Sequence, residues 1–179
     1  MDSIERTMKT ESIFKGKMIS LRVDTVEMEG QRYTKREIVN HPPSVCVVAI
    51  DDDEQLVLVK QFRKPVEKKL YELPAGIIDI GEEPYNAAIR ELSEETGCIA
   101  QECEYLTEFY SSPGFTDEKI YIFYAKNFQQ KDQNLDEFEE IQVERVPLSK
   151  AIKMIEVGDI VDGKTILGIL LYAQLRSKK

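Results

Sequence analysis

The chain has 179 residues and a formal net charge of -9, with 42% hydrophobic and 32% charged residues. This length suffices for one domain with a sizeable core, and the composition is that of an ordinary globular protein. The acidic balance disfavours nucleic acids and anionic membranes as partners, although a bound metal ion can still attract a small phosphate substrate.

Cysteine and histidine usage excludes several classes of site. The chain has three cysteines without close pairs, Cys46, Cys98 and Cys103, and one histidine, His41. This argues against a disulfide framework, a zinc site and a Ser-His-Asp triad, so we expect packing or surface roles for all four. The N-terminus lacks the apolar centre of a signal peptide, and the apolar run Ile166 to Ala173 is too short to cross a bilayer. We therefore expect a cytoplasmic location.

The N-terminal part of the chain predicts short strands. Ile19 to Met28 and Arg32 to Val39 flank a turn at Glu29-Gly30, and Pro42-Pro43 then marks a boundary. We therefore expect an N-terminal strand segment, residues 1–40, and a main domain, residues 41–179.

The main domain predicts a mixed α/β chain. Val45 to Ile50 and Gln55 to Phe62 are apolar runs without alternation around the acidic turn Asp51 to Asp53, which is typical of strands buried on both faces. A helix is expected from Glu83 to Thr96, because Pro84 suits a first turn and Gly97 a helix end. The other expected elements are strands at Leu70–Leu73, Glu104–Tyr110, Lys119–Ala125 and Ile141–Val146, an exposed acidic loop at Gln129–Glu140, and helices at Ser149–Val157 and Thr165–Arg176, the last capped by Asp162 or Thr165.

A cluster of glutamates lies on the predicted helix. Glu91, Glu94 and Glu95 stand at positions i, i+3 and i+4, so their side chains project from one face. Such a run of charges is usually a solvated face. The alternative is a site for Mg²⁺, which prefers carboxylate oxygens, water and substrate phosphates as ligands. Helical spacing alone leaves both interpretations open.

The residues around this cluster decide between the two. Gly76, five residues, Glu82, seven residues, Arg90-Glu91-Leu92, one residue, Glu94-Glu95, one residue, Gly97 and Cys98 follow in this order. The pattern resembles the Nudix box, the signature of the Nudix hydrolases. It departs at Cys98, where Ile, Leu or Val is usual, but cysteine behaves as a small hydrophobic residue and can keep the packing role.

The resemblance implies a fold, a reaction and a metal site. Nudix enzymes fold as an α/β/α sandwich with a mixed sheet, to which we add the small N-terminal β-strand segment, and the box forms a loop–helix–loop. They hydrolyse a nucleoside diphosphate linked to another moiety. By this resemblance Glu91, Glu94 and Glu95 bind Mg²⁺ or Mn²⁺ together with the backbone carbonyl of Ala75. Arg90 orients the glutamates by ion pairing, while Glu82 and the two glycines are more structural.

Segments outside the box resemble the ADP-ribose pyrophosphatase subfamily. Pro113 lies sixteen residues after Gly97 in the segment SSPGFTDE, an offset found in that subfamily. The segments KREIVNH, VLVKQFRKPVEKKLYELPAG and IVDGKTILG are also similar to it. The resemblance therefore covers most of the chain and implies ADP-ribose as the small-molecule substrate, with AMP and ribose 5-phosphate as products.

Several substrate contacts follow from this resemblance. Arg63 matches a position that contacts the substrate phosphates, and Arg36 matches an arginine donated across a homodimer interface to the terminal ribose; the alternative for either is a surface ion pair. Pro113 and Glu118 complete the expected substrate-binding residues. The residue that stacks on the base falls near Lys17, Met18 and Ile19, none of which is aromatic.

The acidic loop resembles the catalytic loop of the subfamily. Glu137 and Glu139 align with glutamates that serve as general base and as an extra metal ligand, and a shift of one residue would substitute Glu140. Glu118 is the next candidate for the base. The alternative is an ordinary solvated loop.

Two other functions stay open. One is a Nudix pyrophosphatase with another substrate, such as a different sugar nucleotide, a dinucleotide or FAD. The other is a module that binds ADP-ribose without cutting it. Sensors derived from this family typically lose box glutamates, whereas here all are present, which favours the enzyme.

Overall fold

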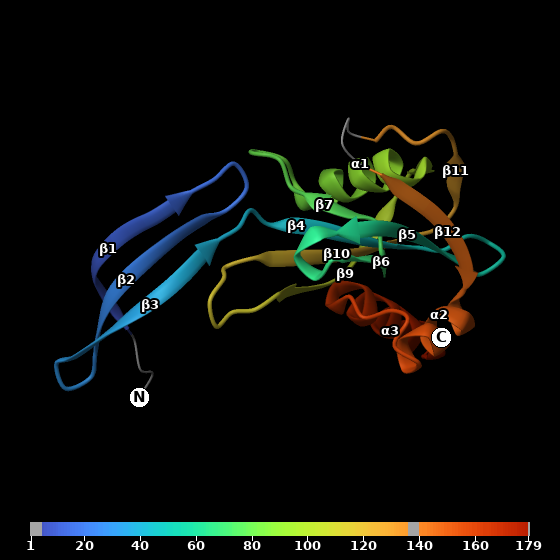
Figure 1. Cartoon of the computed structure of the whole chain (residues 1–179). Helices are drawn as coiled ribbons and strands as arrows, with labels where there is room; N and C mark the ends of the chain where they lie inside the picture. Colours follow the sequence, from blue (N-terminus) through green and yellow to red (C-terminus); the bar gives the residue numbers. More distant parts are fainter. Residues whose placement is uncertain (1–4, 136–139, 179) are drawn as a thin grey trace. The chain divides into compact units, whose positions relative to one another are not determined.

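The computed structural model describes residues 5–135 and 140–178 (Figure 1). They form two compact units, one made of Met1–Pro43 and Tyr110–Lys119, the other of Ser44–Phe109 and Ile120–Lys179. The first unit contains the N-terminal strands and the second contains the box helix.

The first unit is built on a three-stranded antiparallel sheet. Its strands are β1 (Arg6–Lys15), β2 (Ser20–Met28) and β3 (Arg32–Asn40), in the order β1-β2-β3. The predictions for β2 and β3 are confirmed to within a residue. The sequence did not predict β1, because all ten of its residues are exposed and its apolar residues therefore need not alternate with polar ones.

The strands of the second unit form three small sheets. A four-stranded sheet has the order β7-β4-β10-β9, a three-stranded sheet the order β12-β5-β6, and β11 pairs with β8. The central pair, β10 with β4, is parallel, whereas β7 runs antiparallel to β4, so this sheet is mixed as predicted. The strand bounds are β4 Ser44–Ala49, β5 Gln55–Arg63, β6 Lys68–Glu72, β7 Ala75–Ile77, β8 Cys98–Ala100, β9 Cys103–Tyr110, β10 Lys119–Ala125, β11 Phe128–Gln130 and β12 Ile141–Pro147.

The described residues of the second unit also contain three helices. Helix α1 (Pro84–Thr96) begins with the proline at its first position and ends at Gly97, whose φ of 70° places it in the left-handed region that suits glycine. Helix α2 spans Leu148–Glu156 and α3 spans Gly163–Ser177. The Asp162 side chain caps α3 by accepting a hydrogen bond from the Thr165 backbone N–H. All three predicted helices and this cap are confirmed.

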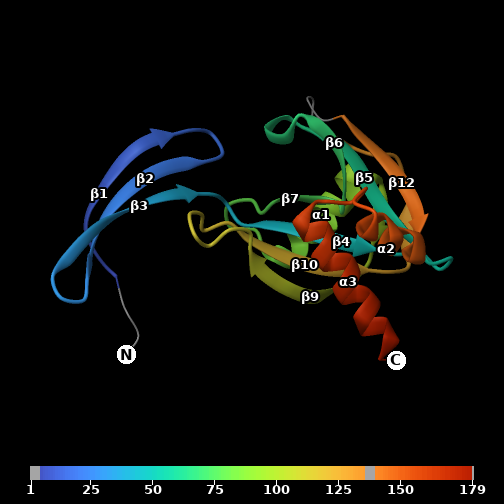
Figure 2. The same cartoon turned by 60° about the horizontal axis from the view of Figure 1, so that its bottom comes forward.

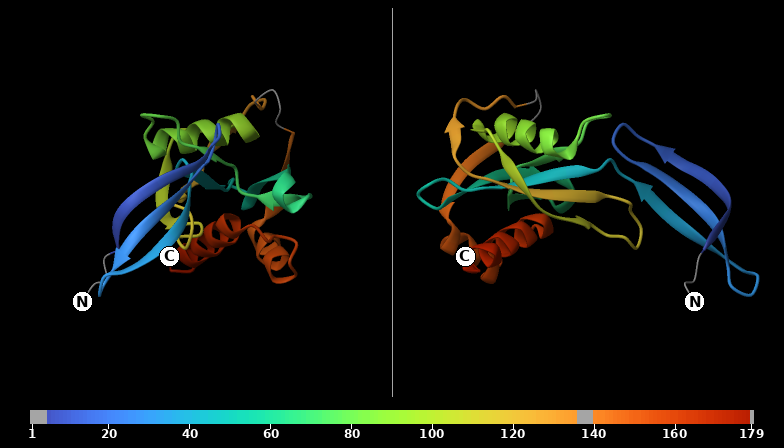
Figure 3. Two further views of the ribbon diagram at one scale, coloured as in Figure 1. Left: turned by 60° about the vertical axis from the view of Figure 1, so that its left-hand side comes forward. Right: turned by 180° about the vertical axis from the view of Figure 1, so that it is seen from behind.

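Strand β4 divides the core into two layers. Its Cys46 and Val48 pack in one hydrophobic cluster with residues of α2 and α3, whereas Val45 and Val47 pack in a second cluster with residues of α1. All four are fully buried, which confirms the prediction of a strand covered on both faces. Figures 1 and 3 show α1 on one side of the strands and α3 on the other, and Figure 2 shows α2 beside α3. The predicted α/β/α sandwich is thus confirmed.

The remaining differences concern short elements. Strands β7, β8 and β11 have three residues each and were not predicted, and β6 begins two residues before the predicted Leu70. A short 3-10 turn, Lys64–Val66, links β5 to β6. All three cysteines are buried and free of disulfides. No helix among the described residues has the length and apolar character needed to cross a membrane.

Candidate active site

Arg90 links the loop before α1 to the helix by hydrogen bonds. Its Nε and Nη2 donate to the two carboxylate oxygens of Glu82 at 2.9 and 2.8 Å, and Nη2 also donates to the Ile77 carbonyl at 3.0 Å. The hydrogen bond from Arg90 holds the pKa of Glu82 below its usual value, despite the opposing effect of burial. The loop that follows β7 is therefore tied to the middle of the helix.

The same arginine also holds two of the clustered glutamates. Arg90 Nη1 donates to Glu91 at 2.7 Å and to Glu94 at 3.1 Å. The Glu91 side chain is 14% exposed and that of Glu94 39% exposed, so neither is a freely solvated surface charge. Their common cation lowers the repulsion that like charges on one helical face would otherwise suffer.

Gly76 leaves room for the Glu91 carboxylate. A Cβ atom built on Gly76 would overlap all three atoms of that carboxylate. The first glycine of the pattern is thus required by the close approach of a side chain from α1 to the backbone of β7.

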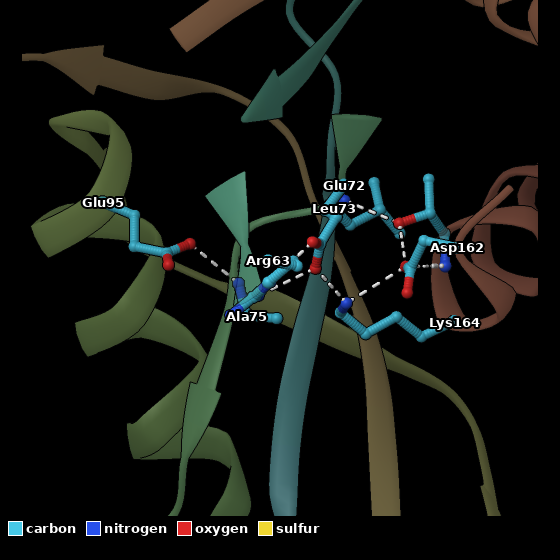
Figure 4. Close-up of polar contacts among 8 residues, drawn as sticks. Arg63, Glu72, Leu73, Ala75, Glu95, Asp162 and Lys164 are labelled. Atoms are coloured by element: carbon cyan, nitrogen blue, oxygen red, sulfur yellow. Dashed lines mark hydrogen bonds and ion pairs between the residues drawn. The ribbon is translucent and has the colours of Figure 1, made fainter. Parts of the chain in front are cut away.

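Glu95 contacts the neighbouring residue of the same strand. It is 4% exposed, and its Oε2 accepts a hydrogen bond from the Ala75 backbone N–H at 2.9 Å. Figure 4 shows this side chain reaching from α1 toward Ala75. Carboxylates of Glu91 and Glu95 therefore lie beside two adjacent residues, Gly76 and Ala75, where β7 begins.

This donor set fits a hard divalent cation. Two carboxylates next to the Ala75–Gly76 backbone supply only oxygen ligands, and Glu94 on the same helix can add a third. In the described part of the chain no three acidic, histidine or cysteine side chains are already grouped as a metal cluster. Arg90 Nη1 instead occupies oxygens of Glu91 and Glu94, so binding an ion there requires these carboxylates to turn from the arginine.

The end of α1 is capped by a distant segment. The backbone N–H groups of Asn134 and Lys131 donate to the carbonyls of Glu94 and Gly97, at 2.9 and 2.8 Å. The side-chain amides of Gln133 and Gln130 donate to the carbonyls of Glu95 and Thr96. Carbonyls at a helix end lack partners within the helix, so this segment satisfies them.

That segment leads into the predicted catalytic loop. The candidates Glu137 and Glu139 lie outside the described residues, and Glu140, which the structure does describe, is exposed. Residues 131–135 are held at the C-terminal end of the helix that bears Glu94 and Glu95.

Arg63 belongs to a partly buried ionic network. Its Nε and Nη2 donate to the two oxygens of Glu72 at 2.7 and 2.8 Å, and Glu72 also binds Lys164 (Figure 4). Lys164 in turn lies 3.0 Å from Asp162. The sequence analysis did not identify Glu72 or Lys164 as site residues, although a charge within the apolar run LYEL was a signal for Glu72.

The other candidates lie in the first unit. Arg36 pairs there with Glu5, with Nε donating at 3.0 Å, and the Glu118 carboxylate lies 3.7 Å from Nδ1 of His41. Pro113 lies in the same unit, between β9 and β10. Met18 and Ile19, where the base-stacking residue was expected, help to line a pocket of about 310 Å³ that also includes Lys15, Gly16, Ser20, Asn40, His41 and Pro42.

Comparison with known proteins gives consistent matches. The NUDIX domain profile matches residues 40–166. An ADP-ribose pyrophosphatase of Bacillus subtilis (strain 168) is 44% identical over 174 residues, covering 96% of this chain and 94% of the relative. A methanol dehydrogenase activator of Bacillus methanolicus is 42% identical with the same coverage. A crystal structure of an ADP compounds hydrolase shares the fold, with a TM-score of 0.88 and 22% identity over 97% of this chain and 95% of that one.

Proposed function

The chain belongs to the NUDIX domain family, and we propose that it hydrolyses the pyrophosphate bond of ADP-ribose to AMP and ribose 5-phosphate. The observation that carries the proposal is the 44% identity to an ADP-ribose pyrophosphatase along almost the whole of both chains. The intact set Arg90, Glu91, Glu94 and Glu95 supports hydrolysis over mere binding. We place the reaction in the cytoplasm.

The family generally depends on a divalent metal ion, and we propose Mg²⁺, with Mn²⁺ as an alternative. Glu91, Glu94, Glu95 and the carbonyl of Ala75 would hold it. When bound, such an ion neutralises the diphosphate and lowers the pKa of a water ligand. Arg90 keeps Glu91 and Glu94 at the same face of α1, and Ala75 keeps Glu95 directed toward β7.

Arg63 is our candidate for binding the substrate diphosphate. Two of its three guanidinium nitrogens bind Glu72, and Nη1 makes no hydrogen bond within the part of the chain that the structure describes. The side chain is 40% exposed, so one face of a fixed cation remains accessible. Arginine suits this role because its guanidinium stays charged and matches the geometry of phosphate oxygens.

In this proposal a glutamate of the acidic loop acts as the general base. A carboxylate outside the metal ligands is needed to accept a proton from the attacking water. Glu137 and Glu139 are the candidates for the base and for an additional metal ligand, and Glu118 is the next one.

Turnover of a nucleotide panel tests the substrate. We expect Mg²⁺-dependent release of AMP and ribose 5-phosphate from ADP-ribose, with lower kcat/KM for other sugar nucleotides, a dinucleotide and FAD. The panel is needed because a relative of nearly equal similarity carries a different name. If ADP-ribose stays intact at saturating Mg²⁺ while another nucleotide is cleaved, the substrate assignment is wrong and the family assignment stands.

We also propose a homodimer in which the N-terminal strands, about residues 11 to 40, pack on a second copy. In β1 Met8, Ile13 and Phe14 are each at least 50% exposed, and β2 buries only Asp24 and Val26. A sheet of two or three strands is marginally stable unless it packs on something larger. In this arrangement Arg36 of one chain serves the site of the other, as the subfamily resemblance implies.

Mixing two inactive variants tests this arrangement. Arg36→Ala and Glu95→Gln, refolded together, should regain part of the activity, because one site of each mixed dimer then holds both native residues. Refolding either variant alone is the control. A monomer by sedimentation, or no recovery from confirmed mixed dimers, would exclude the shared site without affecting the metal chemistry.

A further inference from the structure

Glu72 holds two cations at the end of β6. Its side chain is 2% exposed; Arg63 binds both of its oxygens, and Lys164 binds one of them. Lys164 is itself well buried, with 13% of its side chain exposed. Figure 4 shows the Glu72 carboxylate between the two basic groups. A buried carboxylate of this kind is stable only when paired.

The segment DGKT at the start of α3 supplies Lys164. Asp162 accepts hydrogen bonds from the Thr165 backbone N–H at 3.0 Å and from the Thr165 hydroxyl at 2.6 Å, and it pairs with Lys164. The Thr165 hydroxyl oxygen accepts a bond from the Leu73 backbone N–H at 2.8 Å. These hydrogen bonds join the first turn of α3 to the segment between Glu72 and Ala75. The proposed reaction does not explain why this connection exists.

We propose that Lys164 is a positioning residue for Arg63. Lys164 shares the Glu72 carboxylate with Arg63 and so fixes the position of the guanidinium. It also offsets the negative charge of Glu72, which would otherwise be neutralised by Arg63 alone. Arg63 then keeps Nη1 and its positive potential directed toward a diphosphate. This inference rests on the proposed function, specifically on Arg63 as the residue that binds the substrate diphosphate.

The charges of the network support this role. Arg63 and Lys164 balance Glu72 and Asp162, so the group of four is neutral, and removing Lys164 leaves it with one negative charge. Burial by itself would raise the pKa of Glu72 and lower that of Lys164, but the opposite charges outweigh burial in both cases, and each group stays ionised. An excess negative charge beside Arg63 would weaken its attraction for phosphate oxygens.

Replacement of Lys164 in two backgrounds tests the inference. Lys164→Met should raise KM for ADP-ribose by about 10-fold with kcat little changed, since a contact made equally in the ground and transition states affects KM. In the Arg63→Ala background the same replacement should change KM by less than about twofold. The effects of replacing residues of one ionic network are not additive, and here the effect of Lys164 requires Arg63. Lys164→Gln, which keeps a hydrogen-bond donor for Glu72, replaces Lys164→Met if that variant does not fold.

Lys60→Met is the matched control. Lys60 lies on β5 as Arg63 does and carries the same charge as Lys164, but it donates to the neutral Tyr71 hydroxyl at 3.0 Å. It should leave KM unchanged, which separates the effect on Arg63 from the loss of a positive charge in general. An equal rise of KM with Lys60→Met would overturn the inference.

The outcomes also separate this inference from the proposed function. If Lys164→Met raises KM equally with and without Arg63, or lowers kcat and Tm without affecting KM, Lys164 is only structural and the inference alone fails. If Arg63→Ala leaves KM unchanged, the proposed diphosphate contact fails, and the inference fails with it.

Discussion

Replacing Glu95 or Glu91 by glutamine should lower kcat by at least about 100-fold, the scale seen when one preorganised electrostatic stabiliser is lost. Both carboxylates lie beside the Ala75–Gly76 backbone, where their charge would hold the proposed cation. Glutamine has nearly the same shape, so the packing of α1 on β7 should persist.

The structure makes this test specific for charge in the case of Glu95. Its Oε2 accepts from the Ala75 N–H, and the amide oxygen of glutamine can accept the same bond. Thermal unfolding should therefore change little, while the Mg²⁺ concentration for half-maximal activity should rise. Glu83→Gln is the control, because Glu83 precedes α1, is exposed and makes no capping hydrogen bond. Near-native kcat in Glu91→Gln or Glu95→Gln would show that the replaced carboxylate does not hold a catalytic metal ion.

Local signals explain which elements could be predicted. Helix α1 has a proline in its first turn and a glycine directly after it, and β10 is a continuous apolar run, so both were predicted with bounds correct to one residue. Strands β8 and β11 instead depend on each other, with Cys98 paired to Gln130 across the sequence. Three residues carry too little periodicity to indicate such a pairing.

The site residues also divide into those with a local sequence signal and those that only the fold brings together. Arg90 and its glutamates lie within one helix and one preceding loop, so their spacing in the sequence identified the group. Glu72 and Lys164 are 92 residues apart, and only the fold brings them together. Gly76 had a predicted structural role, but its physical reason, the approach of Glu91 from α1, could not be read from composition or spacing.

The predicted catalytic loop begins from a well-defined anchor. Asn134, Gln133 and Lys131 donate hydrogen bonds to carbonyls at the C-terminal end of α1, those of Glu94, Glu95 and the following Gly97. The loop therefore starts at the helix end that carries two of the proposed metal ligands.

Glu137→Gln and Glu139→Gln should accordingly differ from replacements elsewhere in the acidic loop. A general base contributes about 10²–10⁴-fold, so at least one of the two should lose kcat on that scale while still binding a non-hydrolysable ADP-ribose analogue. Asp132→Asn is the control, because Asp132 lies in the anchored part of the same loop and is exposed. The variant in which the base is replaced should also lose the acidic limb of the pH–kcat profile. The variant in which a metal ligand is replaced should instead require a higher Mg²⁺ concentration. Full activity in both variants would move the base to Glu118, whose replacement by glutamine then becomes the deciding measurement.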